Sequence, residues 1–211
     1  MKFNFYKKTK IFCIGRNKTG TTSLEKAAKD LGLKVGSQYD AELLFPFYIK
    51  RDFAPIIKYC KSAQFFQDVP FSLPYTYQIL DYAFPESKFI LTLRNSDEEW
   101  YNSLINFQTK IHGHDGKLPT IEDLKNSSRI FKGFAYLTKK EIFGTPDDDL
   151  YNKEMMIDHY NQYNKNVLHY FKNKNNLLVI NISKPDSYHE FCSFIGEKPI
   201  YNEFPWENKT V

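Results

Sequence analysis

Short apolar segments alternate with amphipathic ones along this chain. Apolar runs at residues 10–14, 33–36, 63–67, 88–94 and 176–181 are bounded by glycine, proline or polar residues, and each is short enough to predict a strand. The run Phe89-Ile90-Leu91 is nearly continuous, which is typical of a parallel strand covered on both faces. These segments therefore predict the strands of a central sheet.

Helical periodicity fills the stretches between the predicted strands. Four apolar residues from Leu24 to Leu31 recur at i, i+3, i+4 and i+7, which predicts a helix from residue 21 that stops at Gly32. Further helices are predicted over 40–60 (broken near the prolines at 46 and 55), 74–84 (with Pro74 in its first turn), 97–111, 147–172 (with acidic residues 147–149 at its start) and 184–195. We expect a loop and one or two short helices over residues 113–144. Strands that alternate with helices predict a three-layer α/β/α fold around a mainly parallel sheet, with ligands at the carboxyl ends of the strands.

The amino-acid composition indicates a single domain and limits the kinds of molecule that the protein could bind. The 211 residues contain no internal repeat or low-complexity linker, so we expect one domain over residues 1–211. The 29 Lys and Arg nearly balance the 25 Asp and Glu, and a net charge of +4 without a basic block argues against a nucleic-acid partner. Only four of these cations are arginines, at 16, 51, 94 and 129. Each is of interest because the planar guanidinium fork matches phosphate geometry better than lysine does.

Cysteine use indicates a reducing, cytoplasmic environment. The three cysteines are widely spaced without a CxxC pair, so we expect neither a disulfide framework nor a zinc site. No cleavage site of a secretory leader follows the first residues, and no run approaches the ~18 apolar residues of a membrane span. His112, His114 and Asp115 lie in a glycine-flanked loop and are interpreted as solvated, so no metal is predicted.

The first candidate site is the loop between the strand at 10–14 and the helix at 21. Its sequence GRNKTGTT, from Gly15 to Thr22, has glycines that permit a tight turn and N–H groups at 19–22 that point from a helix start towards an anion. An ATP-binding loop, GxxxxGK[ST], has lysine directly after its second glycine. Here Thr21 occupies that place, and Lys18 precedes Gly20 by two residues. The pattern predicts a phosphate cradle of another kind; the alternative is a tight turn with hydroxyl caps.

The second candidate site begins where the strand at 88–94 ends. Arg94 lies at the carboxyl end of that strand, where ligands of such folds bind. Ser103 follows nine residues later in the next helix, and Asn102 takes its place if the register differs by one. Taken alone, Arg94 would more simply be a salt-bridge partner. Trp100 and Tyr101 are interpreted as core or rim residues.

Together the two motifs resemble the donor site of sulfotransferases that use 3′-phosphoadenosine 5′-phosphosulfate (PAPS). The run Lys-Thr-Gly-Thr-Thr-Ser-Leu is similar to the family's 5′-phosphosulfate loop, and the Arg–Ser pair is similar to its 3′-phosphate site. FFQDVPF (65–71) and FCSFIGEKPIYNEFPWEN (191–208, ending at Asn208) resemble further parts of the same branch, and Lys209 is a further candidate at the 3′-phosphate. The resemblance implies the P-loop-like sulfotransferase fold, PAPS as co-substrate and adenosine 3′,5′-bisphosphate (PAP) as product. The donor-binding residues that it implies are Arg16, Asn17, Lys18, Thr19, Gly20, Thr21, Thr22, Arg94 and Ser103; Arg16 is as readily interpreted as a solvated side chain.

Sulfuryl transfer needs a cation at the bridging oxygen and a base for the acceptor proton. The resemblance assigns Lys18 to the first role. For the base, Asp68 stands where cytosolic members of the family carry the histidine of His-x-Pro, and Glu25 stands on the helix where glycan-modifying members carry a glutamate. The structural alternatives are a loop hydrogen bond for Asp68 and an exposed helical charge for Glu25. Both candidates stay open at this point.

The prediction is a sulfotransferase that moves a sulfuryl group to a hydroxyl or amine of a small-molecule, lipid or carbohydrate acceptor. Residues 111–172 match no motif, and we expect the acceptor pocket to vary there. The alternatives are a P-loop nucleotide or small-molecule kinase, which the missing lysine after Gly20 disfavours, and a nucleotide-binding module of the same fold without chemistry.

Overall fold

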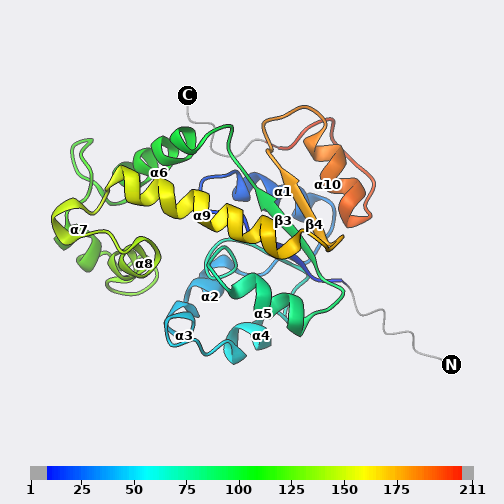
Figure 1. Ribbon diagram of the computed structural model, residues 1–211, viewed down its shortest axis with the longest axis horizontal. Coiled ribbons are helices and arrows are strands. Elements are labelled where there is room, and N and C mark those ends of the chain that lie inside the picture. The colour runs from blue at the N-terminus through cyan, green and yellow to red at the C-terminus, as the bar shows by residue number, and fades with distance from the viewer. Residues whose placement is uncertain (1–8, 206–211) are drawn as a thin grey trace.

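The computed structural model describes residues 9–205, and its centre is a parallel sheet (Figure 1). The four strands are β1 (Ile11–Cys13), β2 (Phe65–Phe66), β3 (Lys88–Thr92) and β4 (Leu177–Ile180), in the order β2-β1-β3-β4. Every pair is parallel. This confirms the predicted α/β class, and it gathers the carboxyl ends of all four strands at one edge.

The strand predicted over residues 33–36 is wrong. Only Val35 pairs there, through a single parallel bridge to Phe65 beside β2. Gly32 and Gly36 bound the segment, and the three residues between them are too few for repeated ladder bonds.

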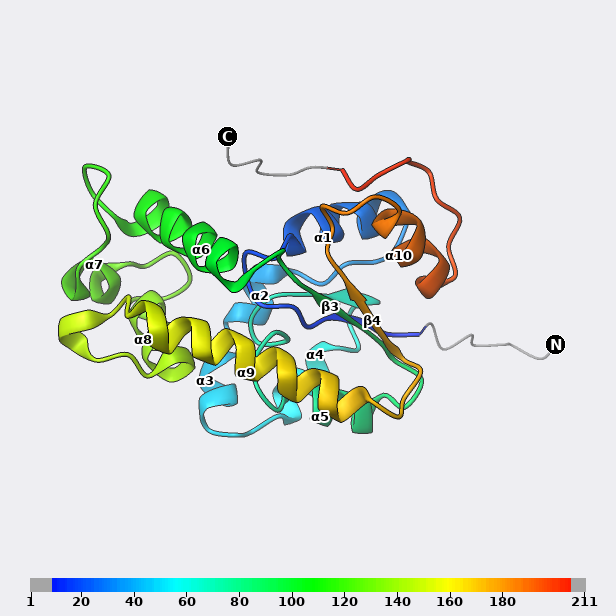
Figure 2. The same cartoon turned by 45° about the horizontal axis from the view of Figure 1, so that its top comes forward.

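Alternation along the strands sends apolar side chains to two separate cores. The even face of β1, with Phe12 and Ile14, packs with Phe66 and Phe89 into a core that helices α3, α4, α5 and α9 complete. The odd face, with Ile11 and Cys13, packs against α1 and α10. Figure 2 shows α1 and α10 on one side of the strands and α5 and α9 on the other. The predicted helix–sheet–helix layering is therefore present.

The helices follow most of the predicted segments. They are α1 (Thr21–Asp30), α2 (Gln38–Glu42), α3 (Phe45–Ile49), α4 (Ala54–Tyr59), α5 (Thr76–Ala83), α6 (Asp97–His112), α7 (Ile121–Asn126), α8 (Phe134–Phe143), α9 (Lys153–Phe171) and α10 (Ser187–Ile195). The predicted breaks near Pro46 and Pro55 are confirmed, because each proline opens a new helix, α3 and α4. Ser96 caps α6 by accepting the N–H of Glu99.

Three predicted helix starts are wrong. Pro74 lies outside α5, whose first flanking residue is Tyr75 in the left-handed region at φ +65°. Residues 147–149 form a separate 3₁₀ turn, and α9 begins at Lys153, because the Asn152 side chain accepts the Met155 N–H. Helix α10 begins at Ser187 and not at residue 184, after Asp186 in the left-handed region at φ +65°. Side-chain caps and left-handed residues of this kind mark where a helix begins, and hydrophobic periodicity does not report them.

Within residues 9–205, no helix is both long and apolar enough to cross a membrane. Asn208 and Lys209, which the sequence analysis singled out, lie outside the described residues.

Candidate active site

The loop between β1 and α1 is shaped by residues in the left-handed region. Lys18 has φ +72° and Gly20 has φ +94°. A Cβ atom on Gly20 would lie 2.2 Å from Ile182 Cδ1, so the close approach also requires glycine. No side chain of the described residues caps α1. Because the first N–H groups of a helix have no partner within it, this helix start is available to an anion.

The loop is braced against the end of β3. The Thr19 hydroxyl donates to the Arg16 carbonyl at 2.6 Å and lies 2.5 Å from the Thr92 hydroxyl. A Cβ on Gly15 would lie 1.9 Å from the same Thr92 oxygen, so the chain passes β3 as closely as glycine allows. The Thr19 side chain thus maintains the loop's shape, while its predicted donor contact stays a prediction.

Arg94 joins the two predicted motifs. Its Nε donates to the Lys18 carbonyl at 2.6 Å, and its Nη2 lies 3.5 Å from Ser103 Oγ. Asn102 is exposed, so the register that places Ser103 beside the arginine is the one present. Nη1 donates to Glu99 Oε1 at 3.1 Å. Sequence reasoning missed Glu99, although an acidic residue five positions after the arginine, in the first turn of the next helix, was an available signal.

Trp100 ties α6 to the phosphate loop. Its ring is buried and stacks on Tyr160 with centroids 4.4 Å apart, which confirms its interpretation as a core residue. Its indole N–H also donates to the Asn17 carbonyl at 2.9 Å, a contact that the sequence analysis missed. The Tyr160 hydroxyl accepts the backbone N–H of Arg94 at 3.3 Å. The indole and phenol groups therefore hold both motifs in place.

The Lys18 side chain turns towards α6. Its Nζ lies 4.2 Å from the centre of the Phe107 ring, a cation–π contact. Burial, and then the charge of Arg94, lower the pKa of Lys18, whereas Asp68 acts in the opposite direction. Phe107 was also missed, although the spacing 100, 103, 107 places it on the same face of α6 as Trp100 and Ser103.

Arg16 is buried, so its interpretation as a solvated side chain is wrong. It is 2% exposed, and its Nη1 donates to the Ser72 carbonyl at 2.6 Å. Its guanidinium lies 5.7 Å from the Phe143 ring centre and 5.3 Å from that of Tyr163. Burial lowers its pKa. These partners come from distant segments of the chain, and they fix the position of Arg16 at the start of the loop.

The two candidate bases have different surroundings. Asp68 is in the left-handed region, at φ +63°, and accepts the Val69 N–H at 2.8 Å, so the loop hydrogen bond named as its alternative is present. Burial raises the pKa of Asp68, opposed by that N–H group and by Arg16, Asn17 and Lys18 of the phosphate loop. Its carboxyl therefore lies beside the predicted donor site.

Glu25 is engaged elsewhere. One carboxylate oxygen pairs with Lys29 at 2.5 Å, and the other accepts the Gln67 amide at 3.0 Å. Its side chain is 16% exposed, so it is not the solvated charge named as its alternative. Of the two candidates, Asp68 is the carboxylate that faces the loop cations.

The histidine-bearing loop contains two unrelated contacts. His112 Nδ1 lies 3.3 Å from Ser127 Oγ, and His114 pairs with Asp123 at 3.3 Å. Within the described part of the chain, no group of three or more His, Cys, Asp or Glu side chains is placed to hold a metal.

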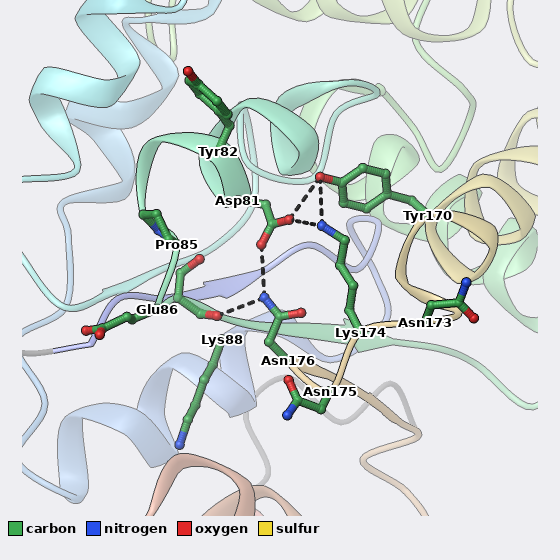
Figure 3. A pocket seen from close by; sticks show the side chains of 11 residues that line it. Asp81, Tyr82, Pro85, Glu86, Lys88, Tyr170, Asn173, Lys174, Asn175 and Asn176 are labelled. Carbon is green, nitrogen blue, oxygen red and sulfur yellow. Dashed lines mark hydrogen bonds and ion pairs between the residues drawn. The ribbon is translucent and has the colours of Figure 1, made fainter.

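Figure 3 shows a pocket at the opposite edge of the sheet, beside the amino ends of β3 and β4. There Asp81 pairs with Lys174 at 2.5 Å and accepts hydrogen bonds from Tyr170 and Asn176, both at 2.9 Å. Burial opposes ionisation, but these hydrogen bonds hold the pKa of Asp81 below its ordinary value. These bonds join α5 to the end of α9 and lie away from the phosphate loop, so we interpret the pocket as structural.

The comparisons with known proteins agree with the geometry of the loop. No curated protein sequence matches the chain. A family model described as the sulfotransferase domain matches residues 10–211, from the start of β1 through both motifs and on beyond α10. With the match covering nearly the whole chain, this protein belongs to the sulfotransferase domain family.

Proposed function

We propose that this sulfotransferase takes its sulfuryl group from PAPS and passes it to a hydroxyl or amine of a small-molecule, lipid or carbohydrate acceptor, releasing PAP. One observation carries the proposal: Arg94 donates to the Lys18 carbonyl and also faces Ser103. The motifs predicted for the two phosphate groups of one bisphosphate therefore adjoin each other, as a single donor requires.

The groups around the loop suit an anionic donor. The uncapped start of α1, with the N–H groups of residues 19–22, would hold the 5′-phosphate. Arg94 and Ser103 would hold the 3′-phosphate, because a guanidinium fork binds phosphate oxygens in pairs. The contacts of Arg94 with Lys18 and Glu99 orient the fork in advance. Arg16 and Asn17 support the loop from its buried side.

Catalysis rests on positioned charge. When bound, PAPS supplies the activated sulfuryl group. Lys18 provides the cation that stabilises negative charge on the departing oxygen, and Phe107 limits where its ammonium points. Asp68 accepts the acceptor's proton, because it lies beside the loop cations and burial makes it a stronger base than an exposed carboxylate.

We also infer the setting in which the protein works. We infer one domain over residues 1–211, in a reducing cytoplasm and without a metal. The three cysteines support the reducing compartment, since all are buried free thiols. The kinase alternative is disfavoured because Thr21 stands where the ATP-binding lysine would be and brings no positive charge to the phosphates of a nucleotide.

The proposal is tested with PAPS and a panel of phenols, sugars, lipids and amines, by following PAP release. Lys18→Met should lower the transfer rate ~100-fold or more while PAP still binds, because its charge acts mainly as the leaving group departs. Lys61→Met, at an exposed lysine, is the matched control and should change neither quantity. PAP binding without release on any acceptor would favour a non-catalytic module instead.

A further inference from the structure

The guanidinium group of Arg94 already contacts three acceptors. Its Nε donates to the Lys18 carbonyl at 2.6 Å, its Nη1 donates to Glu99 Oε1 at 3.1 Å, and its Nη2 lies 3.5 Å from Ser103 Oγ. A guanidinium has five N–H donors, so these acceptors, all within residues 9–205, leave one N–H on each terminal nitrogen. A 3′-phosphate bound to those two N–H groups would share the fork of Arg94 with the Glu99 carboxylate.

The Glu99 carboxylate is also held from its other side. Its Oε2 accepts the backbone N–H of Asn95 at 3.2 Å and the Asn95 side-chain amide at 2.8 Å. The Asn95 amide oxygen in turn accepts the side-chain amide of Asn181, which follows β4, at 3.0 Å. Glu99 cannot turn away from an arriving anion without losing these bonds, so its negative charge stays beside the predicted phosphate position.

The negative charge of Glu99 is not needed to orient Arg94 or to stabilise the fold. The bond from Nη1 to Glu99 helps to orient the fork, but it requires an acceptor oxygen and not a charge. The contact of Nε with the Lys18 carbonyl and that of the Arg94 backbone N–H with the Tyr160 hydroxyl fix the arginine at both ends. The side chains of Arg94 and Glu99 are 23% and 38% exposed, and ion pairs at such positions contribute little to stability. The charge therefore has its effect on what Arg94 binds.

We propose that Glu99 limits how tightly the donor site binds the 3′-phosphate, and so sets the rate at which PAP leaves after transfer. This rests on the proposed use of PAPS. Two negative groups on one guanidinium repel each other, and the Glu99 charge also offsets part of the positive charge that attracts the phosphate. Because PAPS and PAP both carry the 3′-phosphate, Glu99 lowers the affinity for both and shortens the time for which the product stays bound.

The effect of the charge is tested with Glu99→Gln, which keeps an acceptor oxygen for Arg94 and removes the negative charge. PAP should bind this variant about tenfold more tightly by calorimetry and dissociate correspondingly more slowly in stopped-flow displacement, because the repulsion of the 3′-phosphate is removed. Adenosine 5′-monophosphate lacks the 3′-phosphate and should bind the variant and the wild type equally. Glu98→Gln is the matched control, since it removes the same charge from the preceding residue, which pairs with Lys153 at 2.7 Å, and it should leave PAP affinity nearly unchanged.

Salt distinguishes a removed charge from a changed hydrogen bond. The difference in PAP affinity between Glu99→Gln and the wild type should shrink as sodium chloride is added, because the carboxylate is partly exposed and its repulsion is screened. An unchanged or weaker PAP affinity in Glu99→Gln would overturn the proposal and make Glu99 only an orienting residue for Arg94. An equal gain in affinity for adenosine 5′-monophosphate would also overturn it, because the effect would then not act through the 3′-phosphate. Failure of the wild-type protein to bind PAP would instead overturn the proposed function, and with it the product release assigned to Glu99.

Discussion

Gly20 offers a sharp test of how the loop is built, because Gly32 provides a matched control. Both glycines are in the left-handed region, at φ +94° and +81°. Alanine at either position should cost roughly 1–2 kcal/mol for the backbone conformation alone. A Cβ on Gly32 meets nothing within 4 Å, whereas a Cβ on Gly20 would lie 2.2 and 2.6 Å from the last two carbons of Ile182. Only Gly20→Ala therefore adds a clash.

The size of that clash follows from the burial of Ile182. This side chain is 8% exposed and belongs to the core beneath α1 and α10, so it cannot move freely. Overpacking of this kind costs typically about 1–3 kcal/mol. Gly20→Ala should therefore lose roughly 2–5 kcal/mol of unfolding free energy in urea, against roughly 1–2 kcal/mol for Gly32→Ala.

The variants Gly20→Ala and Gly32→Ala also distinguish an effect on stability from an effect on donor binding. If the helix start shifts and one N–H bond to a charged phosphate is lost, PAP affinity falls by about 1.5–3 kcal/mol, which is tenfold or more in Kd. Calorimetry with PAP should show this loss for Gly20→Ala and wild-type affinity for Gly32→Ala. Equal PAP affinities in the two variants would refute the assignment of the loop to the 5′-phosphate.

Three further predictions concern single side chains. Arg94→Lys keeps the positive charge but loses the guanidinium fork, so PAP affinity measured by calorimetry should fall about tenfold. Arg51→Lys, at an exposed arginine, is the control and should leave PAP affinity unchanged. A larger loss of affinity in Arg51→Lys than in Arg94→Lys would contradict the 3′-phosphate assignment. Burial lowers the pKa of Lys139 from 10.5 to about 7, a cost of roughly 4–5 kcal/mol below pH 7 that disappears as the pH approaches 10. Lys139→Met should thus be more stable in urea at pH 6 and lose that advantage at pH 10. A variant less stable at pH 6 would show that the contact of the ammonium with the Tyr151 ring outweighs the cost of burying it without a hydrogen-bond partner. Asp81→Asn should cost about 1–3 kcal/mol at pH 7, and the difference should shrink as the pH falls and the carboxyl of Asp81 takes up a proton. A difference that stays the same across the acid range would rule out the ionised link to Lys174.

The sequence predicted correctly those helices and strands whose pattern of apolar residues or prolines lies within the element itself. The apolar run at β3, the periodic face of α1 and the proline breaks before α3 and α4 are features of a few adjacent residues, and each led to the correct element. The start of α9 could not be predicted from hydrophobic periodicity, because a single hydrogen bond of the Asn152 side chain decides it. Between Gly32 and Gly36, the apolar signal was too short to distinguish a strand from one bridge.

The residues of the candidate site also differ in how far the sequence alone could predict them. Lys18, Arg94 and Ser103 could be singled out because their spacing matches a known motif, and the structure brings them together. The burial of Arg16 could not be predicted, since Phe143 and Tyr163 are more than a hundred residues away in the chain.

The central claim is that the loop and Arg94 bind one adenosine bisphosphate. The most direct measurement is calorimetry of the wild-type protein with PAP, compared with ATP in the presence of magnesium. The account predicts that PAP binds more tightly, without magnesium, and that Arg94→Ala weakens it by ~2 kcal/mol or more. Tighter binding of ATP that requires magnesium would contradict the account and favour a kinase.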